Sequence, residues 1–234
     1  MKYRLVGSEM CIRDSSGTLS VKVSHEGIHS GNSGGSIPSS FRIQRILLDR
    51  VEDSSSGKVT IPEMHVEIPE EVRDNAIALR EIVGDSIWEQ FPTVDSLRQV
   101  SETTEDMIVS MNWEPTLSII GADGIPSVQD AGNVLRTNTD LKLSFRIPPG
   151  VDSEYALARA KAILEEDPPY GAEVIFTPDS CADGFHAPPL EGPVSQAINE
   201  ASMELTGLPP LATWTGGTIP FMAMMQGKYP EAMF

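Results

Sequence analysis

The feature that most limits the fold is an alternating run of side chains that leads into a glycine-rich loop. Apolar and polar residues alternate over residues 19–24, which is the period of a strand with one buried face. Glycine then recurs at positions 27, 31, 34 and 35, and each glycine opposes helix by roughly 1 kcal/mol relative to alanine. We therefore predict a strand that runs into His25 and a loop after it.

The run His25-Glu26-Gly27-Ile28-His29 has the H-E-x-x-H spacing of zinc proteases. That mechanism needs a helix, because only a helix places two histidines four residues apart on one face beside the glutamate. The preceding strand and the glycines oppose a helix here. A stand-alone zinc protease stays as an alternative, and it would require a helix over residues 25–29 and a zinc ion in each chain.

The composition limits the partners. The chain has 234 residues, enough for one large or two modest domains, and 34 acidic against 17 basic residues give a formal net charge of -17. This charge would repel a phosphate backbone or an anionic membrane surface, so neither nucleic acid nor a membrane is expected as a partner. No apolar run approaches the roughly 20 residues of a membrane span. The only cysteines, Cys11 and Cys181, do not make a disulfide framework.

Residues 1–15 need a separate interpretation. They contain neither a basic start with an apolar core nor a helical or strand period, so they do not form a convincing signal peptide. The segment from Leu5 to Asp14 resembles the translation of an adapter used to prepare sequencing libraries. We predict that residues 1–15 are a non-native tail and that the natural protein continues upstream of about Ser16. An ordinary disordered terminus is the alternative.

Further elements follow from apolar periodicity. Helical spacing from Ser39 predicts a helix that ends near Gly57, and a polar, acidic stretch to about Met111 carries a second helix that begins at Pro69. The other predicted strands span 116–120, 141–147 and 172–176, and the other predicted helices span 152–164 and 192–205. This order predicts an α+β (α/β) chain with a small sheet covered by helices on one face, followed by a second, incomplete unit that stops at Phe234.

Two carboxylate-binding features stand out in this plan. Gly216, Gly217 and Thr218 precede a helical start, where free backbone N–H groups and the helix dipole favour a carboxylate. Arg146 lies opposite the apolar face of its strand, from where a guanidinium can bind a carboxylate with two hydrogen bonds. The commoner explanations are a helix start without a ligand and a surface arginine paired with an acid.

The histidines offer two further hypotheses. His29, in a glycine loop at a strand end, can donate a hydrogen bond to an oxyanion, or it is simply an exposed loop histidine. His186 lies near Cys181 and Asp183 in a loose metal-like cluster, but no second histidine follows at ligand spacing. No nucleophile elbow and no phosphate-binding loop is present in the sequence.

Several motifs follow one another in a fixed order along the chain. They are Gly27-Ile28-His29-Ser30-Gly31, Trp113-Glu114-Pro115-Thr116-Leu117-Ser118-Ile119, Asn133, Leu143-Ser144-Phe145-Arg146 and Gly216-Gly217-Thr218-Ile219-Pro220. This combination resembles the cocatalytic zinc peptidases, a family that includes carnosinases, cytosolic nonspecific dipeptidases, aminoacylases and succinyl-diaminopimelate desuccinylases. The resemblance covers nearly everything from Gly17 to Phe234, and the motif that begins at Trp113 and the long acidic insert are most similar to the dipeptidase branch.

The resemblance implies an architecture and a reaction. Residues 16–182 would form the lid, or dimerisation, domain, a four-stranded antiparallel sheet with helices on one face, and residues 183–234 would form part of an α/β catalytic domain. The family consists of homodimeric hydrolases, here expected in the cytoplasm, that cut amide bonds of small peptides or acylated amino acids with two bridged zinc ions and a glutamate base.

The resemblance also assigns roles to particular residues. His29 resembles the lid histidine that stabilises the oxyanion in the partner subunit's site. Asn133 and Arg146 resemble lid residues that bind the substrate's free carboxylate, and the loop Gly216-Gly217-Thr218 would lie beside them in the catalytic domain.

The chain also departs from the family pattern. Asn133-Val134-Leu135-Arg136 lacks the usual proline, and Thr218 replaces the usual serine. No residue of this chain matches the family's metal ligands, so we predict that the chain alone binds no catalytic zinc and has no peptidase activity. The alternative is a non-catalytic dimerisation module, which would not need the loop from Gly216 to Pro220.

Overall fold

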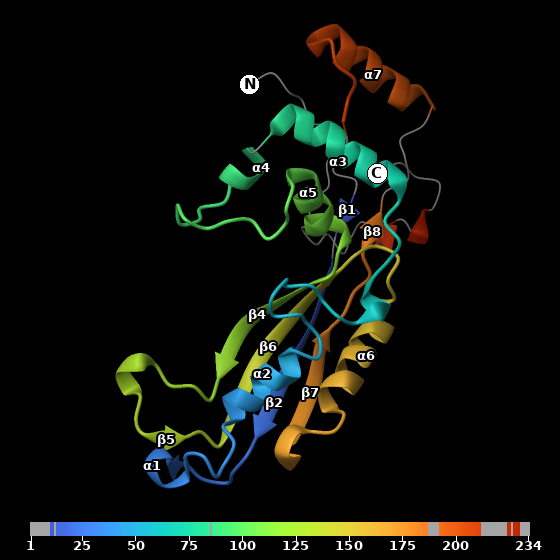
Figure 1. The fold of residues 1–234 in the computed structure, drawn as a ribbon. Coiled ribbons are helices and arrows are strands. Elements are labelled where there is room, and N and C mark those ends of the chain that lie inside the picture. Colours follow the sequence, from blue (N-terminus) through green and yellow to red (C-terminus); the bar gives the residue numbers. More distant parts are fainter. Residues whose placement is uncertain are drawn as a thin grey trace.

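A computed structural model describes residues 10–11, 13–84, 86–186, 192–211, 224–225 and 227–229 of the chain. Its centre is a four-stranded antiparallel sheet in the order β4-β6-β2-β7, which confirms the predicted sheet (Figure 1). The strands are β2 (Arg13–Lys22), β4 (Thr116–Asp123), β6 (Asn138–Ile147) and β7 (Glu173–Ser180). The first three residues of β2 belong to the segment predicted to be a non-native tail.

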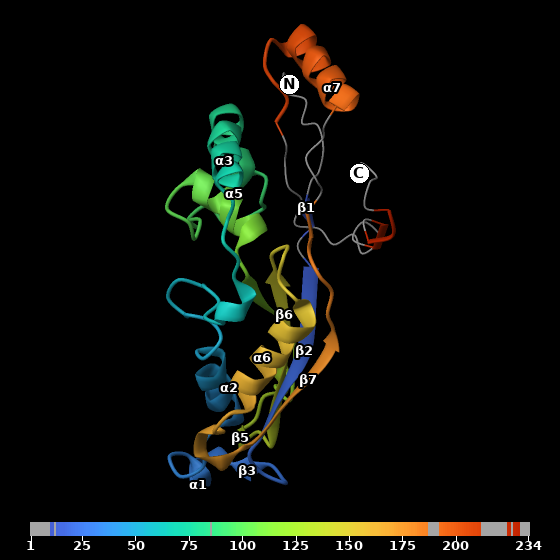
Figure 2. The same cartoon turned by 90° about the vertical axis from the view of Figure 1, so that its right-hand side faces the viewer.

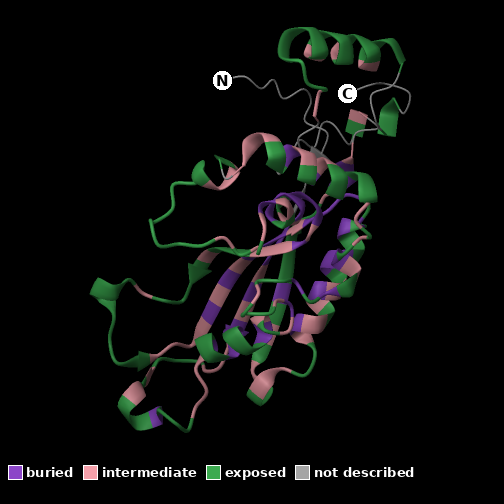
Figure 3. Cartoon of the chain, turned by 45° about the horizontal axis from the view of Figure 1, so that its top comes forward, coloured by how far each residue is buried: buried purple, intermediate pink, exposed green. Residues whose placement is uncertain are grey.

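Alternating side chains fix the register of this sheet. β2 pairs with β6 along its full length, from Arg13 opposite Ile147 to Lys22 opposite Asn138. Leu19 faces Leu141 on one side and Phe176 on the other, and all three are buried. A shift by one residue would turn every apolar side chain to the opposite face, so the hydrophobic pattern specifies this register. Figure 3 shows the alternation of buried and partly exposed positions along the strands.

Two helices cover the same face of the sheet, as predicted (Figures 1 and 2). α2 (Ser40–Leu48) packs on β2 and β6, and α6 (Ser153–Glu165) packs on β7 and β2. Asp152 caps α6 by accepting a hydrogen bond of 2.9 Å from the Tyr155 N–H. The expected end of α2 near Gly57 is wrong. The helix stops at Leu48, and a turn then carries Val51 into the core, so apolar spacing continues beyond the helix.

A second apolar cluster lies between α3 (Glu70–Val83) and α5 (Thr104–Trp113), beyond one end of the sheet (Figure 1). The short helix α4 (Ser86–Glu89) follows α3. α3 begins where the sequence predicted a helix, but α5 was missed. Its consecutive residues Met107, Ile108 and Val109 are all buried, so it shows no single apolar stripe.

Two short strand pairs and several further helices complete the described part of the chain. β3 (Ile28–His29) pairs with β5 (Val134–Leu135), and β1 (Met10–Cys11) pairs with β8 (Phe185–His186). The remaining helices are α1 (Ser30–Ser33), α7 (Gly192–Thr206) and the 3-10 turns Pro62–Met64, Val128–Asp130 and Pro169–Gly171. Among the described residues, no helix is long and apolar enough to cross a membrane.

Candidate functional site

The H-E-x-x-H residues do not form a helix. Residues 25–27 form a bend, and Ile28 and His29 lie in the short strand β3. The two histidines therefore do not share a helical face, which the zinc-protease mechanism requires. The alternative of a stand-alone H-E-x-x-H protease is excluded.

His29 and Asn133 lie side by side at one end of the sheet. His29 pairs with Val134 in the β3–β5 ladder, and the Ser30 N–H donates a hydrogen bond of 2.9 Å to the Asn133 carbonyl. Both side chains are exposed. The structure thus brings two of the predicted site residues together, and the end of the sheet that carries α1, β3 and β5 is called the loop end below (Figure 1).

The loop holds the imidazole of His29 through its own backbone. Nδ1 of His29 accepts a hydrogen bond of 3.1 Å from the Gly31 N–H, and the His29 carbonyl accepts one of 3.0 Å from Ser33 Oγ. His29 is also the N-cap of α1. The ring therefore has a defined position although it is exposed to solvent.

Arg146 lies at the opposite end of the sheet. It is half-buried on β6 and points to the face that α2 and α6 leave open, because its neighbours Phe145 and Ile147 are buried on the helix side. Eight residues separate Arg146 from Asn138, where β6 begins near the loop end, which corresponds to about 26 Å along the strand. Within one chain the structure does not bring Arg146 to His29 and Asn133.

Two aromatic rings mark the Arg146 end. Trp113 precedes β4, whose Thr116 pairs with Arg146, and the rings of Trp113 and His186 meet edge to face with 5.3 Å between centroids. Trp113 is only 4% exposed. Sequence reasoning had placed His186 in a loose metal-like cluster and missed this contact. No local signal points to it, since it depends on the packing of segments far apart in the chain.

The described residues do not fit a catalytic zinc site. Asp183, a member of the loose cluster, accepts a hydrogen bond of 3.0 Å from the Ser153 N–H instead. In the part of the chain that the structure describes, no group of three or more His, Cys, Asp or Glu side chains could hold a metal ion. Zinc requires three or four such ligands. The predicted loop Gly216-Gly217-Thr218 lies outside the described residues.

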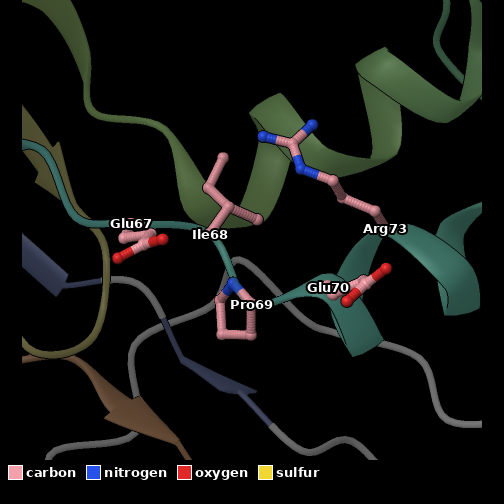
Figure 4. Close-up of a pocket in the computed structure, with 5 residues that line it drawn as sticks. All are labelled: Glu67, Ile68, Pro69, Glu70 and Arg73. Carbon is pink, nitrogen blue, oxygen red and sulfur yellow. The ribbon is translucent and has the colours of Figure 1, made fainter.

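An open hollow of about 480 Å³ lies at the start of α3, away from the residues predicted from sequence. Glu67, Ile68, Pro69, Glu70 and Arg73 line it, and the guanidinium of Arg73 points towards α5 (Figure 4). Its two carboxylates lie beside the positive end of the helix dipole, which is a favourable helix start. The residues that line the hollow do not include His29, Asn133 or Arg146.

No protein-family model matches the chain. A segment of 138 residues is 25% identical to the cysteinylglycine-S-conjugate dipeptidase of Corynebacterium striatum. This segment makes up 58% of this chain and 30% of the dipeptidase. The match thus spans less than a third of the length of this curated relative.

Solved structures share the fold over nearly the whole chain. The di-peptidase Dug1p of Saccharomyces cerevisiae superposes with a TM-score of 0.73 at 20% identity, covering 96% of this chain and 47% of that one. Human carnosine dipeptidase 1 gives a TM-score of 0.68 at 22% identity, covering 96% and 49%. An M20 family metallo-carboxypeptidase of Sulfolobus solfataricus gives 0.63 at 16% identity, covering 94% and 49%. The predicted resemblance is confirmed: over about half of their length, this chain is similar to the M20 peptidases of the dipeptidase branch.

Proposed function

We propose that this chain is part of a homodimeric dinuclear-zinc amidohydrolase of the dipeptidase type, which cleaves amide bonds of substrates that carry a free carboxylate. His29 and Asn133 of one protomer complete the site of the partner protomer. Arg146 binds the substrate's carboxylate in the site of its own protomer. The dipeptidase relatives and the order of the motifs support the reaction class.

The separation of the two candidate groups carries this proposal. A dipeptide spans about 7 Å when fully extended, whereas Arg146 lies about 26 Å along β6 from the loop end. One small substrate therefore cannot touch Arg146 and His29 of the same chain. A substrate that touches both must lie between two protomers.

Each residue has a limited chemical task in this scheme. The imidazole of His29 donates a hydrogen bond to the oxyanion of the tetrahedral intermediate. The guanidinium of Arg146 neutralises the substrate's carboxylate and orients the scissile bond. The amide of Asn133, placed beside His29, contacts the substrate in the same partner site.

Bound zinc ions would supply an activated water and polarise the scissile carbonyl. The described residues do not fit a zinc site, and no residue of the sequence matches the family's metal ligands, so we assign the ligands to parts of the protein outside this chain. The 234-residue chain alone is therefore expected to show no hydrolysis of dipeptides.

The edge strand β4 is the proposed contact with a second copy. Edge strands carry unpaired backbone groups, and charges or prolines discourage them from pairing. The opposite edge strand, β7, contains Pro178 and the charged Glu173 and Asp179 and exposes one isoleucine, Ile175, at 47%. In β4 the one charged residue, Asp123, stands at the end of the strand, and two isoleucines, Ile119 and Ile120, are exposed at 52% and 62%. The exposed isoleucines favour a homodimer through β4.

A subunit-mixing experiment tests the proposal in the full-length protein that contains this chain. His29→Ala and Arg146→Ala homodimers are each expected to be impaired. In a mixed dimer, one site combines an intact Arg146 with an intact His29 from the partner, so about half of the wild-type turnover should return in each mixed dimer, by two-fold symmetry. Co-expression with two different tags isolates the mixed dimer for the assay.

The result also separates the alternatives. Mixed dimers that stay as weak as both parents would place His29 and Arg146 in the same protomer's site or in no site. Wild-type turnover in both homodimers would favour the non-catalytic dimerisation module.

A further inference from the structure

The imidazole of His29 accepts a hydrogen bond from the backbone N–H of Gly31, a group that can only donate. Nδ1 lies 3.1 Å from the backbone nitrogen of Gly31. A backbone N–H group can donate a hydrogen bond and cannot accept one. Nδ1 must therefore be the acceptor, so the neutral ring carries its proton on Nε2.

We propose that Gly31 is a positioning residue that fixes His29 as the Nε2-protonated tautomer, so that Nε2–H is a ready hydrogen-bond donor for the partner subunit's site. The catalytic meaning of this inference rests on the proposed function. The tautomer itself follows from contacts within this chain alone.

The close contact between the His29 ring and the backbone depends on the absence of a side chain at position 31. A Cβ atom on Gly31 would lie 3.0 Å from Cε1 and 3.1 Å from Nδ1 of the His29 ring. These separations are shorter than ordinary van der Waals contacts, so a side chain at position 31 requires the imidazole to shift by a few tenths of an ångström from this position. Glycine lets the ring lie against the backbone from which it accepts its hydrogen bond.

The remaining contacts of the loop fix the backbone that carries the ring. Ser33 is buried, and its hydroxyl donates to the His29 carbonyl at 3.0 Å. The Gly34 N–H donates to the Ser30 carbonyl at 2.8 Å, and the Ser30 N–H donates to the Asn133 carbonyl at 2.9 Å. The loop is thus built before any substrate or partner arrives, which lowers the ordering cost when it docks.

This tautomer separates three possible roles of a site histidine. A general base or a metal ligand needs a free lone pair on a ring nitrogen. In His29 the lone pair of Nδ1 accepts the Gly31 hydrogen bond, and Nε2 carries a proton. The ring is therefore equipped as an oxyanion donor and not as a base or a zinc ligand.

Nitrogen NMR of the histidine rings in the 234-residue chain tests the tautomer directly. The four histidines include His29, and the loss of one set of signals in a His29→Gln variant assigns it. At a pH where the ring is neutral, we expect an unprotonated Nδ1 and a protonated Nε2. A ring protonated on Nδ1, or an even mixture of both tautomers, would overturn the inference without any variant.

A glycine pair then tests the role of position 31. Gly31→Ala should shift the His29 ring towards a mixture of tautomers, whereas Gly132→Ala should not, because a Cβ at position 132 meets nothing within 4 Å. In the full-length enzyme, Gly31→Ala should lower kcat about 10- to 100-fold, the range for a misplaced catalytic group, with little change in KM. An unchanged tautomer and unchanged kcat in Gly31→Ala would overturn the positioning role.

The tautomer of His29 and the proposed function can be refuted separately. If wild-type His29 has the expected tautomer but His29→Ala retains full turnover, the proposed function fails while the tautomer stands. If His29→Ala loses turnover but the ring is protonated on Nδ1, the proposed function stands and the role of Gly31 is refuted.

Discussion

At the loop end of the sheet, His29 is exposed and its ring and carbonyl are held by Gly31 and Ser33, both within four residues. At the other end, Arg146 is half-buried in a strand that pairs with β2 on one side and β4 on the other. The first side chain is positioned by a local loop and the second by long-range strand pairing. The loop can therefore reach outwards to another molecule, while Arg146 stays fixed to its own sheet.

The largest expected effect comes from breaking the proposed contact between protomers. Ile119→Lys places a charge on the apolar edge of β4 and should dissociate the dimer of the full-length protein. Turnover should then fall about 10²- to 10³-fold, the range for losing one oxyanion donor, because His29 no longer reaches the partner's site. Analytical ultracentrifugation and a turnover assay measure both effects.

Ile175→Lys is the matched control for this edge. Ile175 lies on β7 and is 47% exposed, close to the 52% of Ile119, so the same charge is added at the opposite edge. This variant should remain dimeric and active. Dissociation by Ile175→Lys alone would move the interface to β7.

The second prediction concerns the Arg146 end. Arg146→Ala should weaken kcat/KM for substrates with a free carboxylate by roughly 10- to 100-fold, the value of a hydrogen bond to a charged group. Amidated analogues should be affected much less, because they lack the negative charge. Measuring kcat/KM for both substrates gives the ratio, and an unaltered preference for the carboxylate would remove Arg146 from the site.

The sequence predicted most of the sheet because its strands have one buried face. Alternation over residues 19–24 and 141–147 indicated β2 and β6, and Asp152 marked the start of α6 correctly. α5 escaped prediction because adjacent residues such as Ile108 and Val109 are both buried, which leaves no helical stripe. The end of α2 was misplaced because Val51 enters the core through a turn.

For the candidate site, residue types could be predicted from the sequence, but the distances between the residues could not. His29 and Asn133 meet because β3 pairs with β5, and this pairing has no local signature. The distance of Arg146 from both follows from the length of β6 and could not be known before the strand pairing was known. The carboxylate-binding role of the loop from Gly216 to Pro220 stays a prediction.

Gly17 in β2 lies in the tightly packed sheet, whereas the loop end is open, so a substitution of glycine should affect the free energy of unfolding differently in the two regions. A Cβ on Gly17 would lie 2.4 Å from the Phe176 ring and 2.9 Å from the Thr177 carbonyl oxygen. Gly17→Ala should therefore lower the free energy of unfolding by about 1 to 3 kcal/mol through overpacking. Gly132→Ala, at the loop end and free of contacts, should change it by less than about 0.5 kcal/mol. Urea unfolding followed by circular dichroism measures both, and equal effects would contradict the contrast.

The smallest predicted effect lies beside Arg146, at two adjacent serines of β2. Ser15 faces Phe145 in the ladder and is fully buried, and its hydroxyl has no hydrogen-bond partner among the described residues. Ser15→Ala removes an unsatisfied polar group and should raise the free energy of unfolding by about 1 kcal/mol. Ser16→Ala removes a hydroxyl that bonds to Ser180 Oγ at 3.0 Å and should lower it by about 1 kcal/mol.

Opposite signs for these neighbours would show that position 15 calls for an apolar side chain. That outcome would identify the Ser15 hydroxyl as an unpaired buried group whose removal relieves a desolvation cost. Equal destabilisation by both variants would mean that the Ser15 hydroxyl has a hydrogen-bond partner. A serine would then be a favourable residue at this position of β2. Chemical denaturation of the two variants, in parallel with the wild type, decides between these results.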